Sequence, residues 1–295
     1  MSLISNLIPL NLETERERFF ASDGHYNPQF VYRKNYSPKV LTKYGLVSEE
    51  EYQKARTYLD TYVTSRAAKS REFLSLDELQ QMVTGLCAQL QIAPLKLVTN
   101  TEQNSRFMVT REGILVMRWP TQITREQFQA VLDHEVQTHY LRRLNDQRQE
   151  WSGEKRSSVL WKKTDEGLAM CNSRRSGEQD LHQAALLYEL VYVAARADFE
   201  TVYQQNLKRG VDRRQAFVNS LRVKRGLADT SQPGGFTKDL VYWEGYQQVS
   251  AWLADPAHDI RDLYWGKVGL EELEQLRPRA VTVGLIYPTF ITNER

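Results

Sequence analysis

The chain has 295 residues, of which 41% are hydrophobic and 11% aromatic, a globular composition that argues against disorder. Its formal net charge of +2 gives no global reason to expect nucleic acid or a membrane surface as a partner, and no stretch approaches the roughly 18–20 apolar residues of a membrane span. The two cysteines are too few for a disulfide framework or an all-thiolate zinc site, so we expect a reducing, cytoplasmic location.

The first half of the chain predicts helices followed by a small sheet. Ser48 and Ser75 each stand three residues before a glutamate, so each is expected to open a helix with a capping box. After Pro94, "LKLVT" predicts a short strand, and "RFMVTREGILVMRW" predicts a hairpin that turns around Gly113. Thr124 then caps the helix that carries "VLDHEVQTHYLRRLN".

Helix dominates the second half. Further helices are expected to begin near Thr164, Gln179, Asp212 and Thr237, and a short one to cover 269–276. No repeat or long linker interrupts the pattern, so we expect a main domain at 47–295 with an N-terminal extension at 1–46 packed on it. The expected fold class is α+β and mainly helical, with a small antiparallel sheet before the histidine helix.

Two stretches are strongly basic. Arg142–Lys163 holds seven Lys and Arg residues against three acidic ones, and Lys208–Arg225 holds seven against one. Charge runs of this kind are often solvated helix faces. The alternative is that two basic walls meet around one site and attract an acidic partner.

The helix after Thr124 carries His134, Glu135 and His139, so its two histidines are five residues apart. The usual helix-borne zinc motif spaces them four apart. On a straight helix, at about 100° per residue, positions five apart point about 140° away from each other. A π-bulge would absorb the extra residue and return both imidazoles to one face. The motif therefore indicates either two unrelated core histidines or a metal site on an irregular helix.

A catalytic zinc site usually has three protein ligands and one open position. The best third ligand is Glu166 in "TDEGLAMCN". The alternative is that Thr164 caps a helix while Asp165 and Glu166 complement its dipole. That alternative leaves Gly167 unexplained, because glycine is a poor helix former and suits a place where another group must approach closely. Strands followed by a histidine helix are also the element order of zincin-type hydrolases.

Several stretches resemble one family. "HEVQTHYLR" (134–142) followed by "TDEGLA" (164–169) resembles the paired signature of the microtubule-associated tyrosine carboxypeptidases and their bacterial relatives, the QEGLA-motif proteins. "RVKRGLADTSQPGGFTKDLVYWEG" (222–245) resembles a longer family pattern, and "NPQFVY" (27–32) and "GKVGLEELEQLRP" (266–278) match in style and order. The resemblance covers most of the chain.

The resemblance implies that the main domain is a zincin-like zinc metallopeptidase with one zinc ion per chain. His134, His139 and Glu166 would bind the metal, and Glu135 would be the catalytic carboxylate. Eukaryotic members of the family remove the C-terminal tyrosine of α-tubulin, whose tail is acidic. The expected partner is therefore such a tail, on α-tubulin or microtubules, in a cytoplasmic or cytoskeletal location.

A carboxypeptidase also needs a cation for the free C-terminal carboxylate of its substrate. Arg222, Lys224 and Arg225 are the candidates, and arginine is favoured because its planar fork matches a carboxylate. Lys238 and Tyr242 are further candidates for contact with the substrate or the oxyanion. The alternative for the three basic residues is a helix C-terminus that complements its own dipole.

The chain departs from the family pattern in three places. Gln137 stands where the family usually has glycine, and it would either line the cleft and change substrate access or point away. Asp165 stands where glutamate or glutamine is commoner. The long basic N-terminal region of the eukaryotic members is missing, which is compatible with a catalytic core, a bacterial-type member or an engineered version. The alternatives to a tubulin carboxypeptidase are a zinc peptidase of other specificity and a non-catalytic module that binds an acidic partner.

Overall fold

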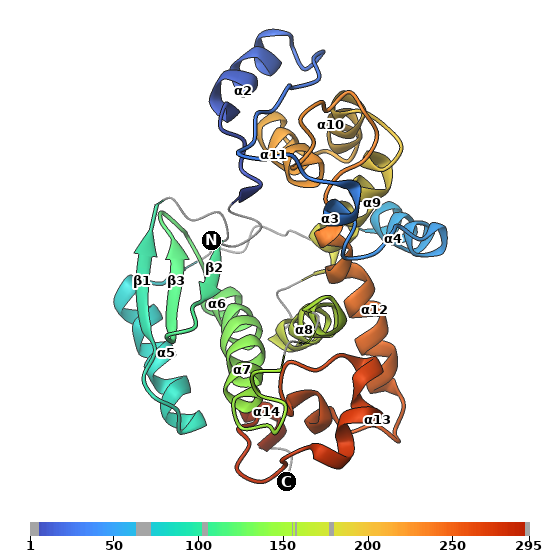
Figure 1. Ribbon diagram of the computed structural model, residues 1–295. Helices are drawn as coiled ribbons and strands as arrows, with labels where there is room; N and C mark the ends of the chain where they lie inside the picture. The colour runs from blue at the N-terminus through green and yellow to red at the C-terminus, as the bar shows by residue number, and fades with distance from the viewer. Residues whose placement is uncertain are drawn as a thin grey trace. The chain divides into compact units, whose positions relative to one another are not determined.

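The computed structural model describes residues 6–62, 72–101, 106–154, 156, 158–176 and 180–292 (Figure 1). The chain divides into two compact units, one formed by Met1–Val63 with Leu181–Trp243 and the other by Thr64–Asp180 with Glu244–Arg295. The expected domain boundary after residue 46 stays a prediction. The architecture is mainly helical with one small sheet, as expected from the sequence.

The first unit is helical. Its helices are α2 (Leu12–Ala21), α3 (Pro38–Leu41), α4 (Glu49–Thr61), α9 (His182–Ala194), α10 (Phe199–Lys208) and α11 (Arg213–Lys224). The Ser48 side chain accepts the Glu51 N–H at the start of α4, which confirms the cap, but the Ser48 N–H donates to the Tyr188 hydroxyl over 3.0 Å, so the reciprocal half of the predicted capping box is not formed. The helix expected near Asp212 is confirmed as α11, and the Asp212 side chain accepts backbone N–H groups at its start. The helix expected near Gln179 begins at His182, and Gln179 itself lies outside the described residues.

Aromatic side chains form the core of this unit. Phe19 of α2 is fully buried, and its ring lies 5.3 Å from that of Phe199, 4.8 Å from that of Tyr203 and 5.2 Å from that of Phe217. Edge-to-face and tilted contacts of this kind are favourable beyond the burial of ring area. They join the N-terminal segment to α10 and α11.

Two of the family-like stretches pair with each other in this unit. Gln29 and Asp229 form an isolated antiparallel bridge, and the Phe30 N–H donates to the Ala228 carbonyl over 2.7 Å. The Thr230 hydroxyl adds a hydrogen bond of 2.7 Å to the Pro28 carbonyl. The "NPQFVY" and "GLADTS" segments thus form one structural piece although about 200 residues separate them.

The second unit contains the sheet and the histidine helix. Its elements are α5 (Leu76–Leu90), β1 (Lys96–Asn100), β2 (Phe107–Val109), β3 (Ile114–Arg118), α6 (Arg125–His134), α7 (Leu141–Asp146), α8 (Ser158–Ser173), α13 (Leu273–Leu276) and α14 (Thr289–Thr292), together with most of α12 (Leu240–Ala254). Ser75 with Glu78 and Thr124 with Gln127 form capping boxes at α5 and α6. No helix among the described residues is both long and apolar enough to cross a membrane.

The sheet is mixed, so the prediction of an antiparallel sheet is wrong for one of its pairs. Its strand order is β1–β3–β2. The predicted hairpin is confirmed, because β2 pairs antiparallel with β3, but β1 pairs parallel with the other edge of β3. The chain reverses direction after β1 and again after β2, and β1 and β3 therefore run the same way. Strand periodicity shows where strands lie but does not determine which edge each one joins.

The sheet and the histidine helix share one hydrophobic core. Leu115 and Met117 of β3 pack in the same buried cluster as Phe128, Leu132 and Val136 of the histidine helix. In this unit α5 lies against β1, while β2 lies against the helix segment that follows α6 (Figure 1). The sheet thus supports the histidine helix from one side.

Helices α8 and α12 approach each other at two glycines. A Cβ atom added to Gly167 would lie 2.2 Å from the backbone oxygen of Gly245, and one added to Gly245 would lie 2.2 Å from that of Lys163. Nothing larger than hydrogen fits at either place. The prediction that Gly167 permits a close approach is confirmed, and the approaching group is the backbone of α12.

Substitution of Gly167 by alanine is therefore expected to lower the free energy of unfolding by about 1–3 kcal/mol, because the new methyl group meets backbone that must move. Gly85 in α5 is the matched control, since it is exposed and an added Cβ would meet no atom within 4 Å. Gly85→Ala should instead stabilise by roughly 0.5–1 kcal/mol through helix propensity. Urea unfolding followed by circular dichroism measures both changes, and equal effects of the two substitutions would contradict the assigned glycine contact.

Candidate metal centre

The histidine helix is irregular between its two histidines. α6 ends at His134, residues Glu135–Tyr140 form a π-helical segment, and α7 begins at Leu141. This confirms the predicted departure from α geometry. The ring centroids of His134 and His139 lie 4.8 Å apart, so the wide turn has brought the two imidazoles together.

Side-chain hydroxyls satisfy carbonyl groups around this π segment. The Thr138 hydroxyl donates to the Asp133 carbonyl over 2.7 Å, and the Tyr264 hydroxyl donates to the Gln137 carbonyl over 2.9 Å. Asn172 of α8 donates to both hydroxyl oxygens over 2.8 Å. All of these groups are buried, so the irregular turn is held by a connected network from other elements.

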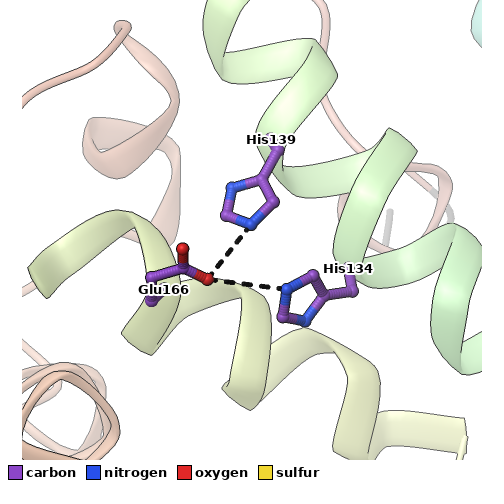
Figure 2. Close-up of side chains that lie close together, drawn as sticks. All are labelled: His134, His139 and Glu166. Carbon is purple, nitrogen blue, oxygen red and sulfur yellow. Dashed lines mark ion pairs between the residues drawn. The ribbon is translucent and has the colours of Figure 1, made fainter. Parts of the chain in front are cut away.

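Glu166 of α8 completes a cluster with the two imidazoles (Figure 2). Its Oε2 atom lies 3.7 Å from His134 Nε2 and 3.4 Å from His139 Nε2, and the donor atoms of the three side chains all lie within 4.8 Å of one another. Zinc bonds of 2.0–2.1 Å in a tetrahedron place two donor atoms about 3.3–3.4 Å apart. Two imidazoles and a carboxylate are also a donor set that catalytic zinc sites use. The two oxygen–nitrogen distances are close to this value, so the residues fit a metal ion.

The second oxygen of Glu166 is engaged by a lysine. Lys162 Nζ lies 2.7 Å from Oε1, one helical turn before the glutamate. Burial opposes ionisation, but Lys162 and His139 outweigh it and hold the pKa of Glu166 well below its usual range. Glu166 is thus anionic at neutral pH, with one oxygen directed to the histidines and the other to the ammonium.

Asp165 lies behind His139. Its Oδ2 atom is 2.9 Å from His139 Nδ1, close enough for an ion pair but outside the direction that a ring N–H hydrogen bond requires. Its Oδ1 atom lies 2.7 Å from both Arg142 Nη1 and Lys267 Nζ. A carboxylate behind a histidine ligand usually orients the ring. Asp165 has this place, which its position in the sequence did not indicate.

Arg142 is fully buried and serves the same cluster. Beyond Asp165, its guanidinium donates to the Leu263 carbonyl over 2.7 Å and to the Val268 carbonyl over 2.6 Å. Burial lowers the pKa of Lys267 to about 8 against the opposing effect of Asp165. One indication of these ion pairs was present in the sequence: Asp165 is a second acidic residue next to the expected ligand Glu166.

Helix α8 begins earlier than predicted. It starts at Ser158, so Thr164 lies within the helix and does not cap it. The Thr164 hydroxyl instead accepts the Leu270 N–H over 3.0 Å, and Glu166 is directed to the histidines. The interpretation of Asp165 and Glu166 as first-turn residues that complement a dipole is therefore wrong.

The first basic stretch, Arg142–Lys163, was expected to be either a solvated helix face or a basic wall, and three of its cations fit neither expectation. Arg142 and Lys162 are paired with Asp165 and Glu166, and Lys163 Nζ lies 2.6 Å from Glu244 Oε2. These cations belong to ion pairs within the second unit, where they neutralise buried carboxylates. They form neither a solvated helix face nor a free basic wall.

Glu135 follows His134 and opens the π segment. Its Oε2 atom accepts the Val109 N–H of β2 over 3.3 Å, so its carboxylate reaches the adjacent strand. It does not belong to the three-residue cluster. Its catalytic role stays a prediction.

The five predicted substrate-binding residues lie in the first unit, whereas the cluster lies in the second. Lys224 is fully buried, and its ammonium donates to the carbonyls of Ala197, Gln232 and Gly234 over 2.7, 2.6 and 3.2 Å. Burial lowers the pKa of Lys224 to about 8. An ammonium enclosed in this way holds the loop after α11 and offers nothing to a substrate carboxylate.

The other four candidates gather around Asp239. Arg222 donates to both oxygens of this buried carboxylate over 2.6–3.0 Å, and Arg225 Nη2 lies 3.9 Å from Oδ2. Lys238 Nζ lies 3.3 Å from the Tyr242 hydroxyl. Asp239 is thus hydrogen-bonded to Arg222 and lies close to Arg225, and the substrate role of these four residues stays a prediction.

The described fold and cluster define a mainly helical protein whose histidine helix carries a candidate metal site. A family model described as microtubule-associated tyrosine carboxypeptidase matches residues 35–294. The chain therefore belongs to the microtubule-associated tyrosine carboxypeptidase family, which confirms the resemblance.

Curated relatives agree with this assignment. Microtubule-associated tyrosine carboxypeptidase 1 is 31% identical in mouse over 305 residues and 30% identical in human over 302 residues, in both cases over 97% of this chain and 64% of the relative. Human MATCAP2 is 30% identical over 300 residues, which are 99% of this chain and 49% of the relative. The chain thus spans about half to two thirds of the length of these relatives.

Asp239 makes a testable contribution to stability. Burial would raise the pKa of its carboxyl, but Arg222, followed by Arg225 and Lys238, leaves the pKa below its usual value. Removing one partner of a buried ion pair costs about 3–5 kcal/mol, so Asp239→Asn should destabilise by about that amount at neutral pH. Because the folded-state pKa is lowered, the difference from wild type should be complete above pH about 4 and should shrink as the pH falls through the folded-state value.

Asp23→Asn is the control, because Asp23 pairs with Arg213 on the surface, with side chains 77% and 55% exposed. Its effect should stay below about 1 kcal/mol. Denaturant unfolding at a series of pH values measures both variants. A pH-independent cost of Asp239→Asn would contradict the ionised pair.

Proposed function

We propose that this chain is a zinc metallocarboxypeptidase that removes the C-terminal residue of an acidic polypeptide tail, with the C-terminal tyrosine of α-tubulin as the first candidate substrate. The observation that carries the proposal is the convergence of His134, His139 and Glu166, which the π segment makes possible. The family assignment and the names of the relatives supply the reaction class and the microtubule partner. A cytoplasmic or cytoskeletal location follows from that partner.

In this proposal His134, His139 and Glu166 hold one zinc ion per chain. Zinc at such a site lowers the pKa of a coordinated water and polarises the scissile carbonyl. Glu135, adjacent to a ligand but not part of the ligand set, accepts a proton from the attacking water and delivers it to the leaving amine as the C–N bond breaks. The products are a shortened chain with a new carboxylate and a free amino acid.

Asp165 orients His139 in this proposal, while Arg142 and Lys267 keep Asp165 ionised. Arg222, Arg225, Lys238 and Tyr242 are proposed to bind the substrate, with an arginine on its terminal carboxylate. Of the two arginines, Arg225 has the weaker contact with Asp239, and its buried Nε has no acceptor among the described residues.

Gln137, which stands where the family usually has glycine, leaves another specificity open. Its side chain is 1% exposed and hydrogen-bonded within the second unit, so it points into the protein. A binding module without catalysis remains the alternative that an activity assay decides.

Glu135→Gln tests the chemistry. We expect the variant to keep about one zinc per chain, because Glu135 is not a proposed ligand, and to lose about 100- to 10,000-fold in the rate of tyrosine release from an acidic tail peptide. Glu126→Gln, on the exposed face of α6, is the control that should keep full activity. Equal rates for wild type and Glu135→Gln would refute the proposed role, and a zinc-loaded wild type that releases nothing would favour the binding module.

Recognition of the substrate carboxylate is tested separately. Amidation of the peptide C-terminus should reduce release to background, and Arg225→Gln should lower kcat/KM for the free-acid peptide by about 10- to 100-fold, because a charge-assisted hydrogen bond is lost. Arg214→Ala, an exposed arginine of α11, should have little effect. If the amidated peptide were cleaved as fast as the free acid, the carboxylate-binding role would be wrong.

A further inference from the structure

The segment Val281–Thr289, here named the C-terminal strap, is tied by side-chain amides to the histidine helix and to the turn that follows α7. Gln149 donates to the Val281 carbonyl and accepts the Val281 N–H, both over 2.9 Å. Asn145 does the same with Ile286, over 2.8 and 2.9 Å. Gln137 accepts both the N–H and the hydroxyl of Thr289, over 2.8 and 2.9 Å. The strap leads into α14, whose first residue is Thr289.

Two of these amides pair with the strap in the same way, and the third, Gln137, differs. A primary amide carries one carbonyl acceptor and two N–H donors, so it can pair with a peptide group much as another strand would. Gln149 and Asn145 pair with a single strap residue each, after the π segment has ended. Gln137 alone makes its contact from inside the π segment.

Gln137 joins the strap to the residue before the first histidine. While its Oε1 atom accepts the two Thr289 donors, its Nε2 atom donates to Asp133 Oδ1 over 2.7 Å. The side chain is buried, and all three bonds use one orientation of the amide. A change at this position therefore acts on the start of the turn that separates His134 from His139 and on the tie of that turn to the strap.

We propose that Gln137 is a positioning residue: by locking the π segment to the C-terminal strap, it sets the spacing of the two imidazoles. Where it concerns metal affinity, this inference rests on the proposed function. The locking of the π segment stands on the hydrogen bonds alone. The strap thereby becomes part of the site although it contributes no residue to the cluster.

The test compares two buried glutamines that hold the same strap. Gln137→Met and Gln149→Met each replace the amide with an unbranched apolar side chain of similar length, and both residues are at most 4% exposed. Hydrogen–deuterium exchange of the metal-free protein is followed in peptides that cover residues 134–141. Exchange there should rise about tenfold in Gln137→Met and stay near wild type in Gln149→Met, whose change should be confined to the strap near Val281.

Zinc affinity, measured by competition with a chromophoric chelator, is the second readout. It should weaken by about 10- to 100-fold in Gln137→Met and by less than about threefold in Gln149→Met. Equal exchange in the π segment of both variants, or equal zinc affinity, would overturn the positioning role. A wild type that binds no zinc would defeat the proposed function, while the exchange comparison would still decide the inference.

Thr289→Val provides a second test of the proposal in case the Gln137→Met variant does not fold. It removes only the hydroxyl donor on the strap side and keeps the side-chain shape. A smaller rise in exchange of the π segment is expected, and unchanged exchange would count against the lock.

Discussion

One extra residue between two histidines sets the geometry on which the candidate site depends. A regular helix would direct His134 and His139 to different sides, and only the wide turn of Glu135–Tyr140 lets both rings meet the same carboxylate. An isolated π turn is unfavourable, so the protein must stabilise it from elsewhere. Thr138, Asn172 and Tyr264 do this through buried hydrogen bonds.

Several charged side chains of the second unit are buried around this turn. Asp165, Glu166 and Arg142 are each at most 5% exposed, and charges so far from water are stable only when they are paired. The pairs form a connected set, because Lys162 contacts Glu166 while Arg142 and Lys267 contact Asp165. Apolar residues of similar size would fill the same space at lower cost. The retention of charge here is consistent with a functional site.

Much of the local structure could be predicted from the sequence because it depends on neighbours along the chain. Ser75 and Thr124 cap their helices through residues three positions away, and the hairpin turns at Gly113 as its pattern indicates. The irregular helix followed from the spacing of two histidines. Gly167 was correctly tied to a close approach, although the sequence could not name Gly245 as its partner.

The features that the sequence did not predict depend on contacts between residues far apart in the chain. Thr164 looked like a cap, but its hydroxyl is used by Leu270, more than 100 positions away. The parallel pairing of β1, the grouping of Arg142 and Lys267 around Asp165, and the inward direction of Gln137 have the same origin. A pattern read along the chain shows which residues can pair, but the tertiary fold selects the pair.

The lysine on Glu166 has a consequence for coordination number. With Oε1 held by Lys162, the glutamate presents a single oxygen to an ion, and the described residues offer it three donors in all. His134, His139 and Glu166 would hold a metal ion with three donor atoms, fewer than the four that close a structural zinc site, and this incomplete set is what allows a ligand to exchange at a catalytic site. If Glu166 supplied both oxygens, the second would compete with such a ligand. Lys162 would thus help to keep a place open for an incoming oxygen atom without touching the ion itself.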